Sequence, residues 1–172
     1  MRTHAEAAIE WLASWNRLDR DAFCGLLAPD FVAKGVMAPD GVDGEAIWNV
    51  MLAFRETFPD QKWELGEWLV SDGDLVVCEV LESGTFAGTW PDPTVDIAPT
   101  GRSYVSDAVM FFRFNADGLV VENQSWYDSV DWFRQIGVDP KVAAPPEGVS
   151  DAQAVLRAKS GDVTTRASER GE

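Results

Sequence analysis

The chain has 172 residues, of which 46% are hydrophobic and 25% are charged, a composition typical of one folded globular domain with a sizeable core. Its 14 basic and 29 acidic side chains give a formal net charge of −15, and this field repels nucleic-acid backbones and anionic lipid surfaces. No apolar run approaches the roughly 20 residues that a bilayer span needs, and the N-terminus lacks the apolar core of a secretory signal. We therefore expect no nucleic-acid partner, no membrane partner and a cytoplasmic location.

Two helices are predicted at the start of the chain. Within residues 3 to 17, apolar side chains from Ala8 to Trp15 recur at the i, i+3, i+4, i+7 spacing of one helical face. A shorter helix begins at Asp19 and must end before Pro29, because the residue preceding a proline is pushed out of the α region. A short strand over residues 31–37 should follow.

A third helix and a first hairpin come next. Helical spacing returns over about residues 44 to 57 and ends at Phe58-Pro59. The period then changes to two, and Asp72-Gly73-Asp74 turns the chain into a second strand over residues 75–86. Helices that precede antiparallel strands are the order of an α+β fold.

A second hairpin and a last helix complete the pattern. Residues 90–98 are rich in proline and aspartate, which favours a loop at the rim of the fold. Strands are predicted over residues 102–114 and 119–127 with a tight turn between them, followed by a helix over residues 129–136.

The composition shifts after residue 139. We expect residues 1–139 to form the pocket domain, and residues 140–172 to form a linker and a poorly ordered tail with one weak helix over residues 151–159.

Few histidine or cysteine residues are present that could bind a metal ion or act in nucleophilic catalysis. The chain has one histidine, His4, and its two cysteines, Cys24 and Cys78, lack a CxxC spacing or a third ligand. Both cysteines are expected to act as small buried hydrophobes. No metal and no cofactor is therefore predicted, and Ser-His-Asp or Cys-His catalysis is excluded unless a second chain contributes.

The strand that leads to Asp128 presents two faces. One face holds Glu122, Gln124, Trp126 and Asp128, and the other holds Val121, Asn123, Ser125 and Tyr127. One of the two must face the concavity that a curved sheet encloses over helices. A carboxyl held at its mouth beside an indole would be partly desolvated, which raises its pKa toward the range useful for proton transfer. Asp128 is thus the candidate acid/base residue; the alternative is that it only caps the helix that follows.

Aromatic residues are abundant enough to line a ligand cavity as well as a core. Trp126 and Trp48 are the first candidates for the walls of such a cavity, and Tyr104 is a further one. Asp107 lies inside an apolar strand, where an ionised group either borders the pocket or faces water.

Several short motifs follow one another over roughly residues 5 to 138. They are FRETFPD at residues 54–60, Gly84-Thr85, PTGR at residues 99–102, FRF followed by DG within residues 112–118, and Asp128 followed by Gln135-Ile136-Gly137. In order and spacing this series resembles the SnoaL-like polyketide cyclases of the nuclear transport factor two-like superfamily.

The resemblance implies a cone of curved antiparallel sheet closed by helices around a single pocket. It also implies ring closure of a hydrophobic polyketide ester by intramolecular aldol condensation, without metal or cofactor, and with Asp128 as the acid/base group. Two positions depart from the family pattern: Phe86 stands where many relatives have a histidine, and Gln124 where many have a tryptophan. Both residues are expected to border the ligand.

Two other functions stay open beside the cyclase. The PTGRSY hexapeptide resembles limonene epoxide hydrolases, whose Asp-Arg-Asp relay needs an arginine beside an aspartate on the middle strand, and Val77 to Glu82 (VCEVLE) offers neither. The fold is also compatible with a protein that binds a hydrophobic small molecule without catalysis. Exposed apolar positions on the strands after residue 100 predict a homodimer through the sheet.

Overall fold

A computed structural model describes residues 2–35, 38, 40–91 and 96–139. Its helices are α1 (His4–Arg17), α2 (Arg20–Cys24), α3 (Gly44–Thr57) and α4 (Ser129–Ile136), and its strands are β1 (Leu27–Gly35), β2 (Lys62–Asp72), β3 (Leu75–Thr85), β4 (Ser103–Phe114) and β5 (Val120–Tyr127). The tail, its expected helix over residues 151–159 and part of the expected rim loop lie outside the described residues.

The helices predicted within the described residues are confirmed, and the first three begin at a capping residue. Thr3 and Glu6 form the capping box of α1, in which each side chain bonds the backbone N–H of the other. Asp19 and Asp43 accept hydrogen bonds from the first turns of α2 and α3. None of the described helices is both long and apolar enough to span a bilayer.

The sheet has the order β1-β5-β4-β3-β2. Neighbours are antiparallel except for β1, which returns beside β5 in parallel. The strand expected over residues 31–37 therefore begins earlier, at Leu27. Its register with β5 shifts between Leu27 and Val32, where Pro29 lacks the N–H that a regular ladder needs. Proline is tolerated there because β1 is an edge strand.

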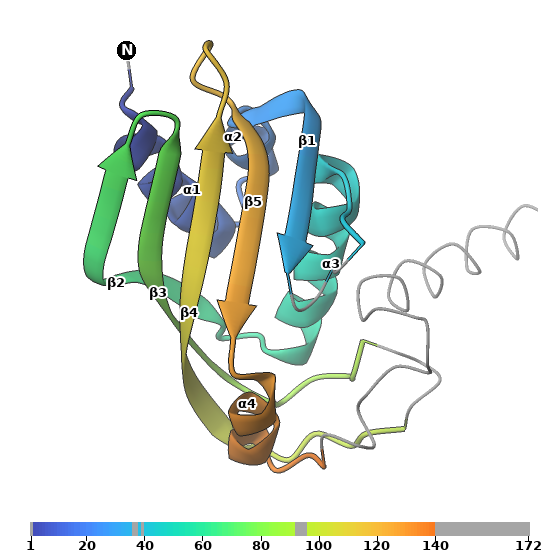
Figure 1. The fold of residues 1–172 in the computed structure, drawn as a ribbon. Helices are drawn as coiled ribbons and strands as arrows, with labels where there is room; N and C mark the ends of the chain where they lie inside the picture. Colours follow the sequence, from blue (N-terminus) through green and yellow to red (C-terminus); the bar gives the residue numbers. More distant parts are fainter. Residues whose placement is uncertain (1, 36–37, 39, 92–95, 140–172) are drawn as a thin grey trace, which may run out of the picture.

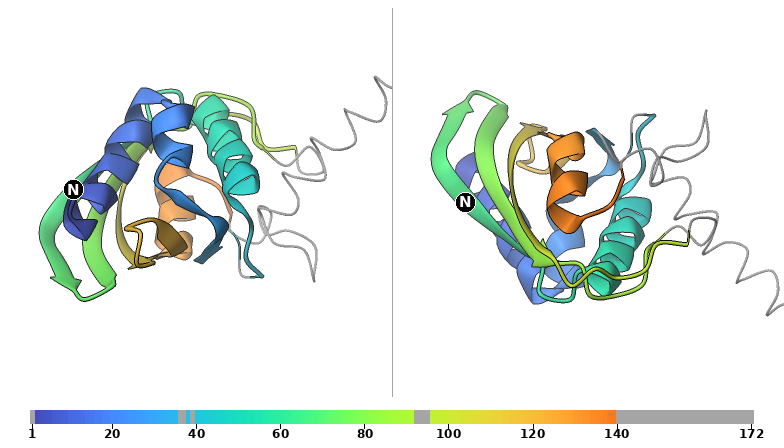
Figure 2. Two further views of the ribbon diagram at one scale, coloured as in Figure 1. Left: turned by 90° about the horizontal axis from the view of Figure 1, so that it is seen from above. Right: turned by 90° about the horizontal axis from the view of Figure 1, so that it is seen from below.

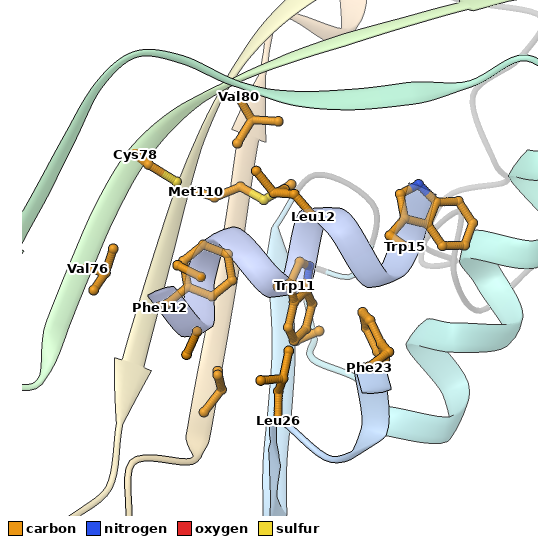
Figure 3. Close-up of a cluster of buried hydrophobic side chains, with 14 of the residues drawn as sticks. Trp11, Leu12, Trp15, Phe23, Leu26, Val76, Cys78, Val80, Met110 and Phe112 are labelled. Carbon is orange, nitrogen blue, oxygen red and sulfur yellow. The ribbon is translucent and has the colours of Figure 1, made fainter. Parts of the chain in front are cut away.

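The fold is the predicted α+β cone. Helices α1 to α3 cover one face of the sheet, and the strands curl around them (Figures 1 and 2). The core lies between α1 and the inner face, where Trp11 and Trp15 meet Met110 and Phe112 from β4 and Val80 from β3 (Figure 3). These side chains are almost fully buried, which fixes how α1 sits across the sheet.

Helix α4 closes one end of the cone, below β4 and β5 in Figure 1. The part of β4 that precedes Ala108 has no β5 partner, and the Gln135 amide takes that place by bonding both the N–H and the C=O of Val105 at 2.9 Å. The Thr100 hydroxyl donates to the C=O of Ile136 at 2.6 Å, which ties the end of the helix to the segment before β4. Thr100 of the PTGR motif and Gln135 of the last motif thus help to position α4.

Candidate functional site

A cavity lies between the inner face of the sheet and the helices. It has a volume of about 90 Å³ and is partly open to solvent. Trp15, Met51 and Phe54 line it from α1 and α3, Trp132 lines it from α4, and Glu82 and Met110 are among the strand residues that complete it. The lining is mainly apolar and aromatic, as in small-molecule sites. Because an apolar cavity of about 150 Å³ admits benzene, the enclosed part here suits at most a group of one ring.

Glu82 supplies the one carboxyl group among the described residues that line this cavity. Its Oε1 accepts two hydrogen bonds, one from the Tyr104 hydroxyl at 2.5 Å and one from the Gln61 amide at 2.6 Å. No described residue donates to Oε2, and this oxygen is not sealed in the protein interior. The carboxyl is thus held in place through one oxygen while the other is left for a ligand.

Burial raises the pKa of the Glu82 carboxyl above its usual value, and this effect outweighs the donors, Tyr104 first, that favour the charged form. The indole N–H of Trp63 also favours the carboxylate, although it does not reach hydrogen-bonding geometry. Burial and the Glu82 charge together raise the pKa of Tyr104, so its hydroxyl stays protonated and donates. A carboxyl with a raised pKa in an apolar pocket fits general acid/base chemistry.

Local sequence explains how Tyr104 reaches Glu82. Position 84 pairs with Tyr104 across β3 and β4, and it is a glycine. A Cβ atom there would lie 3.1 Å from the Tyr104 ring and 3.4 Å from the Gln61 backbone. The missing side chain lets the Tyr104 ring lie across β3 toward the carboxyl two residues away.

The face of β5 that lines the cavity is not the face that was expected to carry the chemistry. Asn123, Ser125 and Tyr127 line the pocket. Trp126 and Gln124 pair with outward residues of β4 instead, and half of the Trp126 surface is exposed. The alternation was right, but strand alternation alone does not say which face is buried. Trp126 and Gln124 therefore do not line the cavity.

Asp128 follows the outward face as well. It is exposed, its Oδ1 accepts a hydrogen bond from the N–H of Asp131 at 3.0 Å, and it is the N-cap of α4. It is not among the residues that line the cavity. Its position supports the capping interpretation.

The remaining sequence candidates lie in three different environments. Trp48 is buried in the main core against Trp15 and Phe23, and Phe86 is buried in a second cluster near α4. Asp107 is exposed on the outer face of β4. Of the expected ligand contacts, Tyr104 alone approaches the pocket, through its hydrogen bond to Glu82.

Glu82 was not among the residues expected from the sequence, although a signal for it exists. Val76, Cys78 and Val80 alternate as inward residues of β3, and Glu82 continues the same phase. A carboxyl in phase with buried positions marks either a buried charge or a functional group. Gln61 lies just before β2 in a turn, where no pattern distinguishes it.

The described part of the cavity shows neither the relay of an epoxide hydrolase nor a metal site. The described lining residues hold no arginine and no aspartate, so the Asp-Arg-Asp relay of an epoxide hydrolase is not assembled there. Within the described ranges, no three His, Cys, Asp or Glu side chains come together as a metal site.

The comparisons with known proteins give one family match and a shared fold. A sequence model of the SnoaL-like domain matches residues 8–123. IdmH, a candidate polyketide cyclase from Streptomyces antibioticus, superposes with a TM-score of 0.70 at 23% identity, over 80% of this chain and 100% of that one. AclR, a candidate hydroxylase from Streptomyces galilaeus, gives 0.65 at 24% identity, over 78% and 95%.

A protein of ketosteroid isomerase-like fold from Catenulispora acidiphila, solved with trimethylamine, gives a TM-score of 0.63 at 18% identity, over 79% of this chain and 95% of that one. No curated protein matches the chain. At these identities the solved structures establish a common fold.

Proposed function

Because the chain belongs to the SnoaL-like domain family, whose model matches residues 8–123, we propose that it is a cofactor-independent enzyme of the cyclase or isomerase type with Glu82 as its acid/base group. The observation that carries this proposal is the placement of Glu82: a carboxyl that lines an aromatic cavity, fixed through Oε1 by Tyr104 and Gln61, with Oε2 free of protein partners among the described residues.

In this mechanism the Glu82 carboxylate takes a proton from a carbon acid next to a carbonyl group. The carbanion then attacks a second carbonyl carbon of the same molecule, which forms the carbon–carbon bond and leaves an alkoxide. Protonated Glu82 returns the proton to that alkoxide, so the carboxylate is regenerated and no cofactor is consumed. A related isomerisation differs only in returning the proton to another carbon.

The cavity walls supply orientation. Trp15, Phe54 and Trp132 offer flat apolar surfaces, and a hydrophobic substrate such as a polyketide would be held near attack geometry against them. The small enclosed volume implies that one ring or chain segment is enclosed while the rest of a larger substrate extends through the open side.

A generic carbon acid tests this base without knowledge of the substrate. In 5-nitrobenzisoxazole, removal of the ring C–H proton breaks the N–O bond and releases a coloured nitrile phenolate, and a desolvated carboxylate accelerates this step. We expect the wild-type protein to catalyse the reaction and Glu82→Gln to lower the rate by about 100-fold or more, because the amide keeps the shape and loses the base.

Asp128→Asn is the matched control, since it also converts a carboxylate to its amide. It should leave the rate unchanged. If Asp128→Asn removes the activity while Glu82→Gln retains it, the acid/base role belongs to Asp128. If the probe binds and no variant alters its slow background reaction, the protein is a non-catalytic binder.

We also propose a homodimer formed through the outer face of the sheet. Val105 is 61% exposed there, and Trp126, Val70 and Leu81 add further exposed apolar surface on neighbouring strands. Exposed apolar side chains on neighbouring strands are typical of an interface, and the two-fold pairing of identical faces is the commonest way to cover them.

A further inference from the structure

We propose that Asn123 and Ser125 on β5 form a hydroxyl-binding subsite in the same cavity, remote from Glu82, so that the substrate carries a hydroxyl group far from its reacting carbon. This inference rests on the proposed function of the pocket and specifies what that pocket recognises. Nothing in the reaction assigned to Glu82 requires polar groups at this place.

Of the two residues, Asn123 gives the stronger evidence for the subsite. Its side chain lines the cavity and is 6% exposed. Its Nδ2 donates to the C=O of Phe111 at 3.1 Å, and because that partner can only accept, the orientation of the amide is fixed. Oδ1 therefore remains as a pure acceptor. It has no partner among the residues described, and it is not sealed off from the cavity.

Ser125 lies two positions further along the same strand and on the same face. Its side chain lines the cavity, and in the described part of the chain its hydroxyl makes no hydrogen bond. Gly35 of β1 is packed so closely against it that a Cβ atom at that position would lie 2.1 Å from the Ser125 carbonyl oxygen. Ser125 is thereby held on a rigid strand with its hydroxyl available as donor or acceptor.

The surroundings of these two groups are mainly apolar, and the lysine that also lines the cavity, Lys34, has its Nζ ion-paired with Glu122 at 2.9 Å. Ala33 from β1 and Met110 from β4 flank them in the cavity, with Trp11 from α1. A polar side chain in such a place loses its hydration and regains it only from a ligand that offers the complementary group. An exposed Oδ1 acceptor calls for a donor, and a hydroxyl group is the donor that a neutral hydrophobic molecule most simply supplies.

The sheet register places the two polar groups and Glu82 at different levels of the sheet. Glu82 lies opposite Ser106 of β4 and Asn123 lies opposite Phe112, six residues further along the same strand. At about 3.3 Å a residue this is roughly 20 Å measured along β4, while the side chains of both levels line the same cavity. Binding energy gained at the hydroxyl would thus orient the substrate without altering the chemistry at Glu82.

The test compares two ligands of nearly equal size, phenol and fluorobenzene. Phenol can donate a hydrogen bond and fluorobenzene cannot. Their dissociation constants are measured by protein-observed NMR titration in a Glu82→Gln background, so that the result does not depend on turnover. We expect phenol to bind roughly three- to tenfold more tightly than fluorobenzene. The preference should vanish in Asn123→Leu and weaken in Ser125→Ala. The serine substitution changes the side-chain volume least, so a weakened preference in that variant does not reflect a folding defect.

Gln124→Leu is the control, because it makes the same amide-to-leucine change at the adjacent residue on the outer face. It should keep the full preference for phenol. Equal affinities in the starting protein, a preference that survives in Asn123→Leu and Ser125→Ala, or no binding of either ligand would overturn the subsite. A preserved preference in a protein that lacks proton-transfer activity would leave the subsite standing and count against the acid/base role of Glu82 alone.

Discussion

The Tyr104 hydroxyl donates a hydrogen bond to Oε1 of Glu82 across 2.5 Å, from β4 to the neighbouring strand β3. The two residues are offset by two positions in the register, with Gly84 opposite Tyr104. Tyr104 is itself 2% exposed and packs edge-on against Phe58 and Trp132. The carboxyl is therefore positioned by a ring that the second aromatic cluster holds in place.

Removal of this donor should shift the titration of the base. Tyr104→Phe keeps the ring packing and deletes the hydrogen bond that favours the carboxylate, so the pKa of Glu82 should rise further. We expect the pH midpoint of the proton-transfer rate to move to higher pH than in the wild-type protein. A pH–rate series with both proteins measures this, and a midpoint that moves to lower pH would contradict the arrangement.

The raised pKa of Glu82 also makes a prediction about stability. A folded-state pKa above the ordinary value of 4.5 means that the folded protein binds more protons than the unfolded chain between the two values. This contribution stabilises the fold below the unfolded pKa and is lost as pH rises through the folded pKa. The free energy of unfolding of the wild-type protein, relative to Glu82→Gln, should therefore fall over that window. Urea titrations at several pH values measure the difference, and a rise would refute it.

Asp128 should matter for helix stability. Asp128→Ala removes the cap that accepts from the N–H of Asp131, at a cost of about 0.5–2 kcal/mol in unfolding free energy. Asp128→Asn should cost little, because asparagine is an equally good N-cap. Equal losses in both variants, measured by chemical denaturation, would mean that the charge of Asp128 has a further partner.

The outer face of the sheet should control assembly. Val105→Glu places a charge within the proposed interface, and we expect it to convert the dimer to a monomer in sedimentation at micromolar concentration. Ile9→Glu is the control, because Ile9 is also exposed and apolar but lies on α1. A wild-type protein that sediments only as an 18.9 kDa particle would rule the dimer out.

The architecture could be predicted from the sequence because the elements carry redundant local signals. The period of α3, its stop at Phe58-Pro59 and the turn at Gly73 each indicate a boundary by themselves. The parallel pairing of β1 could not be predicted, since it depends on where an edge strand docks after a helix. Local sequence says little about such long-range partners.

The site was harder to predict than the fold for one physical reason. Alternation divides β5 into two equivalent-looking faces, and the face with Trp126 and Asp128 carries the more conspicuous side chains. The buried face holds smaller polar residues such as Asn123 and Ser125, which gain meaning only once the helices are seen to cover them. Glu82 was overlooked in a strand that reads as apolar core.

The most direct test of the account is whether one ionisation governs both the carboxyl and the reaction. The titration of Glu82 can be followed by infrared difference spectra between the wild-type protein and Glu82→Gln, and the 5-nitrobenzisoxazole rate can be measured on the same samples. We predict a carboxyl midpoint above the ordinary value of 4.5 that coincides with the midpoint of the rate, which rises with pH. A rate that persists unchanged in Glu82→Gln, or a Glu82 that titrates at or below its ordinary value, would contradict it.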